Sequence, residues 1–175
     1  MSWSAEVKAP FLQRFDLALR AAAPITLSLL ILLLSQVPVG LPGGLAFTPF
    51  LPLICVFYWT VHRPDLMPGW AVFVLGVLHD LLSGGPFGVG AFTLLAAYGL
   101  VASQRRFLVS FGVGLLWLAF AVLALLAALL VWLLSMMIMG VFLNPAPLAY
   151  QYVLTVAVYP LLAWFFARTQ KSVLR

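Results

Sequence analysis

Carboxylates can perform acid–base or proton-transfer chemistry, and this chain has only four of them in 175 residues. They are Glu6, Asp16, Asp65 and Asp80, and only Asp80 lies inside an apolar run. A pair of carboxylates for peptide-bond hydrolysis within a membrane is therefore excluded. The sequence also lacks HExxH, GxSxG, a P-loop and a Cys/His cluster with metal-ligand spacing. We predict no catalytic residue, no metal site and no cofactor.

Asp80 precedes a helix-breaking turn at residues 83–86, with the sequence SGGP. An ionised carboxylate at the centre of a membrane span costs roughly 2.5–3.5 kcal/mol to insert. A position nearer the interface, protonation, or acceptance of backbone N–H groups freed by the turn would each offset this cost. We favour the third arrangement, and a proton- or ligand-binding role stays as the alternative. His79 points about 100° away on a helix, which disfavours a His–Asp catalytic pair and predicts a polar contact with another helix.

The rest of the chain is too apolar for a soluble protein. Hydrophobic residues make up 65% of the sequence and charged residues 7%, and the mean hydropathy is +1.17. A soluble domain contains about 25% charged residues. A spanning helix takes roughly 20 residues, which leaves room for five or six spans and for no separate soluble domain. The sequence therefore predicts a single all-α membrane domain over residues 1–175.

Proline, glycine and charged residues divide this domain into six predicted spans. Segment 107–142 is the longest, and we count it as one crossing because no Gly or Pro occurs between residues 115 and 139. The predicted spans are approximately 21–39, 46–61, 67–82, 87–102, 107–142 and 147–167. Residues 1–20 precede them as an interfacial amphipathic helix or as a simple positive anchor. Residues 168–175 follow as a basic tail.

The basic residues predict the orientation of these spans, because Lys and Arg collect on cytoplasmic loops. With the N-terminus inside and six crossings, all nine basic residues fall on the cytoplasmic side: Lys8, Arg14, Arg20, Arg63, Arg105, Arg106, Arg168, Lys171 and Arg175. Five or seven crossings would put the last three outside. The sequence therefore predicts that both termini are cytoplasmic. The net charge of +5 reflects this topology, so we predict no nucleic-acid partner.

Two proline features stand out within this layout. Arg63 and Pro64 form a tight inside turn between the second and third spans, which is either a simple solvated turn or a docking site for a cytoplasmic partner. Pro160 lies within the last span. Because proline lacks a backbone N–H, we expect it to kink the helix and to leave a carbonyl free for a neighbouring helix.

Aromatic side chains near the predicted cytoplasmic ends of the spans are typical of membrane proteins, in which amphipathic rings favour the headgroup level. We interpret most of them as generic interfacial anchors. They are Tyr58, Trp59, Trp70, Tyr98 and Trp164.

Three stretches, TPFLPLICVFYW, GVLHDLLSGGPFGVGAF and AAYGLVA, resemble the MreD family of bacterial rod shape-determining proteins at this spacing. The size, the six spans and the small hydrophilic ends fit along the whole chain. The sequence departs from the family pattern at His79 and in the Gly84-Gly85-Pro86 run. The residues that carry the resemblance are Pro49, Tyr58, Trp59, Gly76, Asp80, Leu81, Leu82, Ser83, Gly84, Phe87, Gly88, Tyr98 and the Tyr159-Pro160 step.

The resemblance implies a non-enzymatic protein of the bacterial inner membrane that belongs to the cell-elongation machinery. Such proteins associate with MreC, a partner with one span and a periplasmic domain. They help to couple MreB filaments to peptidoglycan synthesis by a SEDS-type glycosyltransferase and its transpeptidase. The family is also similar in architecture to the substrate-binding components of energy-coupling-factor vitamin transporters. A membrane component of a small-molecule transporter is therefore the alternative function.

Overall fold

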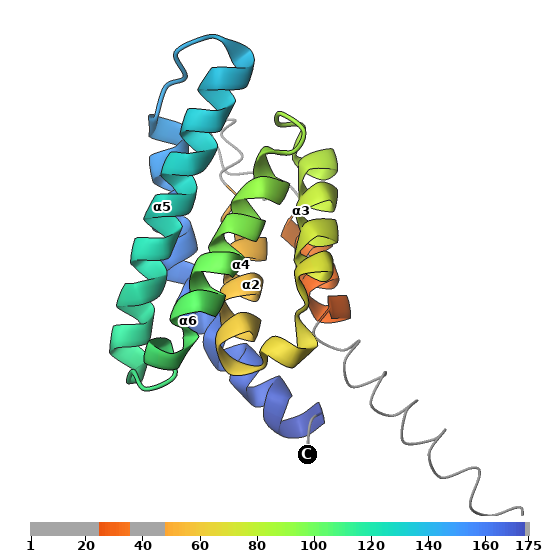
Figure 1. Ribbon diagram of the computed structural model, residues 1–175, viewed down its shortest axis with the longest axis vertical. Coiled ribbons are helices and arrows are strands. Elements are labelled where there is room, and N and C mark those ends of the chain that lie inside the picture. The colour runs from red at the N-terminus through yellow and green to blue at the C-terminus, as the bar shows by residue number, and fades with distance from the viewer. Residues whose placement is uncertain (1–24, 36–47, 174–175) are drawn as a thin grey trace, which may run out of the picture.

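The computed structural model describes residues 25–35 and 48–173, and within these ranges the chain is helical and has no β-strand. Figure 1 shows the helices side by side in a bundle, with α5 and α6 forming one side and α3 the other. The predicted all-α class is confirmed for this part of the chain. The helices are Ile25–Ser35, α2 (Leu51–His62), the short 3₁₀ helix η1 (Pro64–Leu66), α3 (Gly69–Ser83), α4 (Val89–Leu108), α5 (Val113–Met139) and α6 (Ala146–Val173).

The helix ends differ from the predicted span boundaries. Helix α2 begins at Leu51, five residues after the predicted start, and α4 continues through both of its arginines to Leu108. Segment 107–142 contains one long helix, α5, and α6 extends to Val173, into the predicted basic tail. The predicted lead-in at residues 1–20 and the ends of the first predicted span lie outside the described residues.

Two of the described helices are long and apolar enough to cross a membrane, namely Val113–Met139 and Ala146–Arg168. Helix α2 has 12 residues and α3 has 15. At 1.5 Å per residue, α2 rises only about 18 Å, which is less than the ~30 Å hydrocarbon core. The helix lengths alone do not establish six crossings, which remain a prediction.

Helix α2 lies at the centre of the bundle. Every residue from Pro52 to Val61 is buried, so this helix has no polar face and packs on all sides against other helices. Phe57 makes edge-on ring contacts with Phe120 of α5 and Tyr159 of α6, and the latter two rings stack with their centroids 4.3 Å apart. These aromatic contacts attach the α5–α6 pair to the centre of the bundle.

Helices α5 and α6 expose many of their apolar side chains. Val113 at the start of α5 is 88% exposed and Met137 near its end is 80% exposed, and Leu161 and Trp164 of α6 are also exposed. Soluble proteins rarely expose apolar patches of this extent. The exposed faces of these two helices are suited to contact with lipid.

Helices α3 and α4 form a hairpin whose backbones approach closely at Gly76. A Cβ atom on Gly76 would overlap the backbone of Ala91 in α4. Only glycine permits this separation of the two helices. The close approach brings the end of α3 beside the beginning of α4, where the candidate site lies.

Candidate functional site at the α3–α4 turn

The turn between α3 and α4 depends on two glycines with left-handed backbone conformations. Gly84 ends α3 with φ = 66°, and Gly88 precedes α4 with φ = 93°. Residues with a Cβ atom adopt this conformation only at an energetic cost, so glycine suits both positions. Pro86 lies between them and cannot extend α3. The SGGPFG sequence thus stops one helix and starts the next within a few residues.

Asp80, one turn before the end of α3, caps the beginning of α4. Its Oδ2 accepts hydrogen bonds from the backbone N–H groups of Gly88, at 2.9 Å, and Ala91, at 3.1 Å, and its Oδ1 accepts one from Gly90, at 2.9 Å. An N-cap side chain normally accepts from the second and third helical residues. Gly88 occupies the N-cap of α4 and has no side chain, so the preceding helix supplies the carboxylate instead.

The surroundings of Asp80 explain how a carboxylate is accommodated in so apolar a chain. Asp80 is 6% exposed. Burial of an unsatisfied polar group is costly, but three backbone N–H groups donate to the carboxylate, and the positive end of the α4 dipole lies beside it. Gly90 is necessary for the fit, because a Cβ atom there would overlap the Asp80 carboxylate. The carboxylate and the first turn of α4 are therefore complementary in shape and in charge.

The predicted contact between Asp80 and backbone amides is present, but the donors differ from those expected. We expected the N–H groups of the broken turn, and the observed donors are those at the start of α4. Ser83 contributes a long hydrogen bond of 3.5 Å from its hydroxyl to the backbone carbonyl of Asp80. The site thus joins α3 to α4 and does more than satisfy the turn itself.

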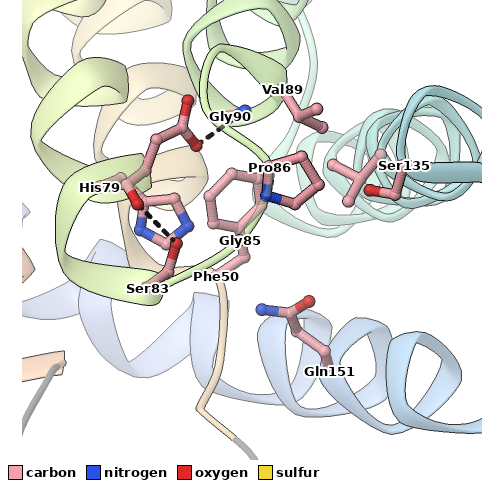
Figure 2. Close-up of a pocket in the computed structure, with 11 residues that line it drawn as sticks. Phe50, His79, Ser83, Gly85, Pro86, Val89, Gly90, Ser135 and Gln151 are labelled. Atoms are coloured by element: carbon pink, nitrogen blue, oxygen red, sulfur yellow. Dashed lines mark hydrogen bonds between the residues drawn. The ribbon is translucent and has the colours of Figure 1, made fainter. Parts of the chain in front are cut away.

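A cavity of about 180 Å³ lies beside this turn, between the α3–α4 hairpin and the α5–α6 pair. Figure 2 shows Phe50, Pro86, Ser135 and Gln151 around it. The His79 ring packs against that of Phe50 with the centroids 4.9 Å apart. Its Nδ1 is buried and has no hydrogen-bond partner among the described residues, so the predicted polar contact with another helix is not found for this atom.

The other sequence candidates lie away from this turn. Arg63 follows α2 and Pro64 begins η1, at the opposite end of α3 from Asp80.

Tyr58 and Trp59 are 2% and 3% exposed, so their predicted role as headgroup-level anchors is wrong, because α2 is enclosed by other helices. Trp70 and Trp164 are exposed, as an anchor requires.

Pro160 lies within α6, which continues past it. Figure 1 shows the last part of α6 leaning away from α5.

Several contacts that the sequence did not predict connect distant segments. The Arg105 guanidinium donates from Nε to the Val61 carbonyl of α2 at 3.2 Å. The backbone N–H of Phe50 donates to the Thr155 hydroxyl at 2.8 Å, and the Gln151 amide donates to the Thr48 carbonyl at 3.2 Å. The polar residues were visible in the sequence, but separations of 44 to 105 residues gave no signal for their partners.

Among the described residues, no group of three or more His, Cys, Asp or Glu side chains could hold a metal ion.

The structure is helical, with apolar exposed faces and a structural carboxylate at a helix junction. These features define the class of helical membrane proteins. The sequence model of the family "rod shape-determining protein MreD" matches residues 16–169, and the chain therefore belongs to the MreD family. No curated protein and no solved structure matches the chain. Membership fits a role in rod-shape determination, and the family is not a known enzyme family.

Proposed function

We propose that this protein is a non-enzymatic scaffold of the rod-shape complex in the bacterial inner membrane. In this role it binds MreC and couples it, with MreB, to peptidoglycan synthesis by a SEDS glycosyltransferase and its transpeptidase. The observation that carries the proposal is the match to the MreD family over residues 16–169. The exposed apolar faces of α5 and α6 support it, because a membrane scaffold requires helix surfaces that other spans can contact.

The proposal includes six crossings with both termini in the cytoplasm. The arrangement of the described basic residues supports this layout. Arg63 follows the end of α2, Arg105 and Arg106 lie in the last turn of α4, and Arg168 lies near the end of α6. The hydrogen bond from Arg105 to Val61 places the ends of α2 and α4 side by side. The positive-inside rule assigns this end of the bundle to the cytoplasm.

The function can be tested by depletion and replacement in the source bacterium. Depletion is expected to turn rods into round cells, and a tagged copy of the chain is expected to restore the rods and to copurify with MreC. The Gly99→Ala variant is a suitable control, because a Cβ atom at that position would contact nothing within 4 Å. If depleted cells kept their normal width and length, the scaffold function would be rejected.

The transporter alternative requires a ligand pocket, and the cavity of about 180 Å³ beside Asp80 is the observation that bears on it. An engineered cavity of about 150 Å³ accommodates benzene, so this one has room for a group of similar size. The alternative predicts that a metabolite copurifies with the protein. Native mass spectrometry of protein purified in mild detergent would reveal such a ligand as a constant mass increment.

A further inference from the structure

The cavity beside the α3–α4 turn is lined by hydrogen-bond acceptors. Its Asp80 carboxylate uses Oδ2 twice and Oδ1 once, and because a carboxylate can accept about four hydrogen bonds, Oδ1 retains capacity for one more. The amide nitrogen of Gln151 already donates to Thr48, which leaves its oxygen available as an acceptor. Ser135 contributes a hydroxyl on a side chain that is 7% exposed. The buried Nδ1 of His79 has no partner among the described residues.

These acceptors come from both sides of the cavity. Asp80 belongs to α3, Ser135 to α5 and Gln151 to α6. Figure 2 shows the side chains of Ser135 and Gln151 pointing toward Phe50 and Pro86 from the opposite side. A ligand with several N–H donors on one atom could therefore bridge the α3–α4 hairpin and the α5–α6 pair.

The charges of the lining favour a cation. Among the described residues that line the cavity, Asp80 is the only acidic one, and there is no Lys or Arg. The described basic residues occupy the opposite end of the bundle. The ring of Phe50 adds an aromatic lining, which favours a cation over an anion. A bare metal ion fits poorly, because about 180 Å³ exceeds its needs and an aromatic wall supplies no ligand.

We propose that this cavity binds a primary ammonium group, carried by an ammonium-bearing phospholipid headgroup or by a free amine. R–NH₃⁺ carries three N–H donors for the acceptors that line the cavity, and its positive charge complements the Asp80 carboxylate. Exposed Leu82 and Phe87 flank the cavity residues in sequence and can contact acyl chains. In the proposed topology the ligand comes from the outer leaflet, but binding itself does not depend on the topology or on the scaffold function.

The test is native mass spectrometry of the full chain in detergent, with phosphatidylethanolamine, phosphatidylcholine and phosphatidylglycerol added separately. We expect phosphatidylethanolamine to bind at least about tenfold more tightly than the other two, because only its headgroup can donate charge-assisted N–H hydrogen bonds to the lining. Phosphatidylcholine keeps the positive charge without N–H donors, and phosphatidylglycerol has neither. Competition by free ethanolamine would identify a small amine as a sufficient ligand, and lack of competition would identify the intact lipid.

Two variants locate the site. Ser135→Leu fills the cavity and Gln151→Met removes an acceptor, so each is expected to abolish the preference for phosphatidylethanolamine. Ser103→Leu is the matched control, because Ser103 is exposed and lies near the other end of the bundle. If Ser135→Leu does not fold, as judged by circular dichroism, Gln151→Met carries the comparison. Equal binding of the three lipids, or an unchanged preference in the folded variants, would overturn the proposal.

Discussion

The indole Nε1 of Trp117 in α5 lies 3.1 Å from the carbonyl oxygen of Val156 in α6. Pro160 stands four residues after Val156 and has no N–H to donate to that carbonyl, so a side chain of the neighbouring helix supplies the missing donor. The prediction that Pro160 frees a carbonyl for another helix is confirmed. The contact joins two largely apolar helices, and in lipid such a hydrogen bond has no competition from bulk water.

The Trp117→Phe variant is expected to lower the free energy of unfolding by about 0.5–1.5 kcal/mol, the usual contribution of one hydrogen bond. Pro160→Ala restores the intrahelical donor to Val156, so Trp117→Phe should cost less in that background. The double-mutant cycle can be measured by SDS-induced unfolding in mixed micelles, followed by circular dichroism. Trp70→Phe is the control for an exposed indole, and equal costs of Trp117→Phe in both backgrounds would contradict the pairing.

Substitutions of Asp80 should separate the capping role from the charge. Asp80→Asn keeps one acceptor oxygen and turns an amide group toward one of the three donors, so we expect a loss of about 1–3 kcal/mol. Asp80→Leu leaves three N–H groups at the start of α4 without an acceptor and should greatly reduce the amount of folded protein in membranes. Immunoblots of membrane fractions measure the amount of each variant in the membrane.

Cell-shape complementation adds the second readout for Asp80. If Asp80→Asn reaches normal abundance and still fails to restore rods, the charge has a role beyond capping. If Asp80→Leu accumulates normally, the capping role is refuted. Asp80→Glu is a useful companion, because the Asp80 carboxylate packs directly against Gly90 and a longer side chain would displace it from its three donors, so we expect it to be as disruptive as Asp80→Asn.

The helix junction was predictable from sequence in part. A carboxylate inside an apolar run needs donors, and SGGP ends a helix, so a contact between Asp80 and free amides followed from local chemistry alone. The identity of the donors did not follow. Gly88, Gly90 and Ala91 reach Asp80 because Gly76 allows α4 to approach α3. Hydropathy locates helices but does not determine how they contact one another.

The same reasoning explains the other differences between the sequence predictions and the structure. Tyr58 and Trp59 lie near the end of a predicted span, and this position suggested the headgroup level. Their burial depends on the helices that surround α2, which a single span does not reveal. The cavity likewise combines Phe50, Ser135 and Gln151 from three separate segments. No short-range pattern relates such residues, whereas Pro160 and its free carbonyl belong to one helix and were predictable.

The close approach of α3 and α4 at Gly76 leads to a matched pair of glycine substitutions. Gly76→Ala introduces a Cβ atom that would overlap the backbone of Ala91, so the helices must separate, at a cost of about 1–3 kcal/mol. Gly99→Ala in α4 meets no atom within 4 Å and should be neutral or stabilising by up to about 1 kcal/mol, because alanine favours helix. SDS-induced unfolding compares the two, and equal stabilities would mean that the close packing is not essential.

Arg105 and Arg106 provide a test of the contact between α4 and the end of α2. Each Gln substitution removes one positive charge from the same helix end, so the effect on topology should be equal. Only Arg105 donates to the Val61 carbonyl, and a charged donor at a helix C-terminus contributes about 1–2 kcal/mol. We therefore expect Arg105→Gln to lower the free energy of unfolding by that amount and Arg106→Gln to leave it nearly unchanged. SDS-induced unfolding at low and high salt measures both variants. If the two lose the same amount and the loss disappears at high salt, Arg105 acts through its charge alone and the hydrogen bond to α2 has no measurable role.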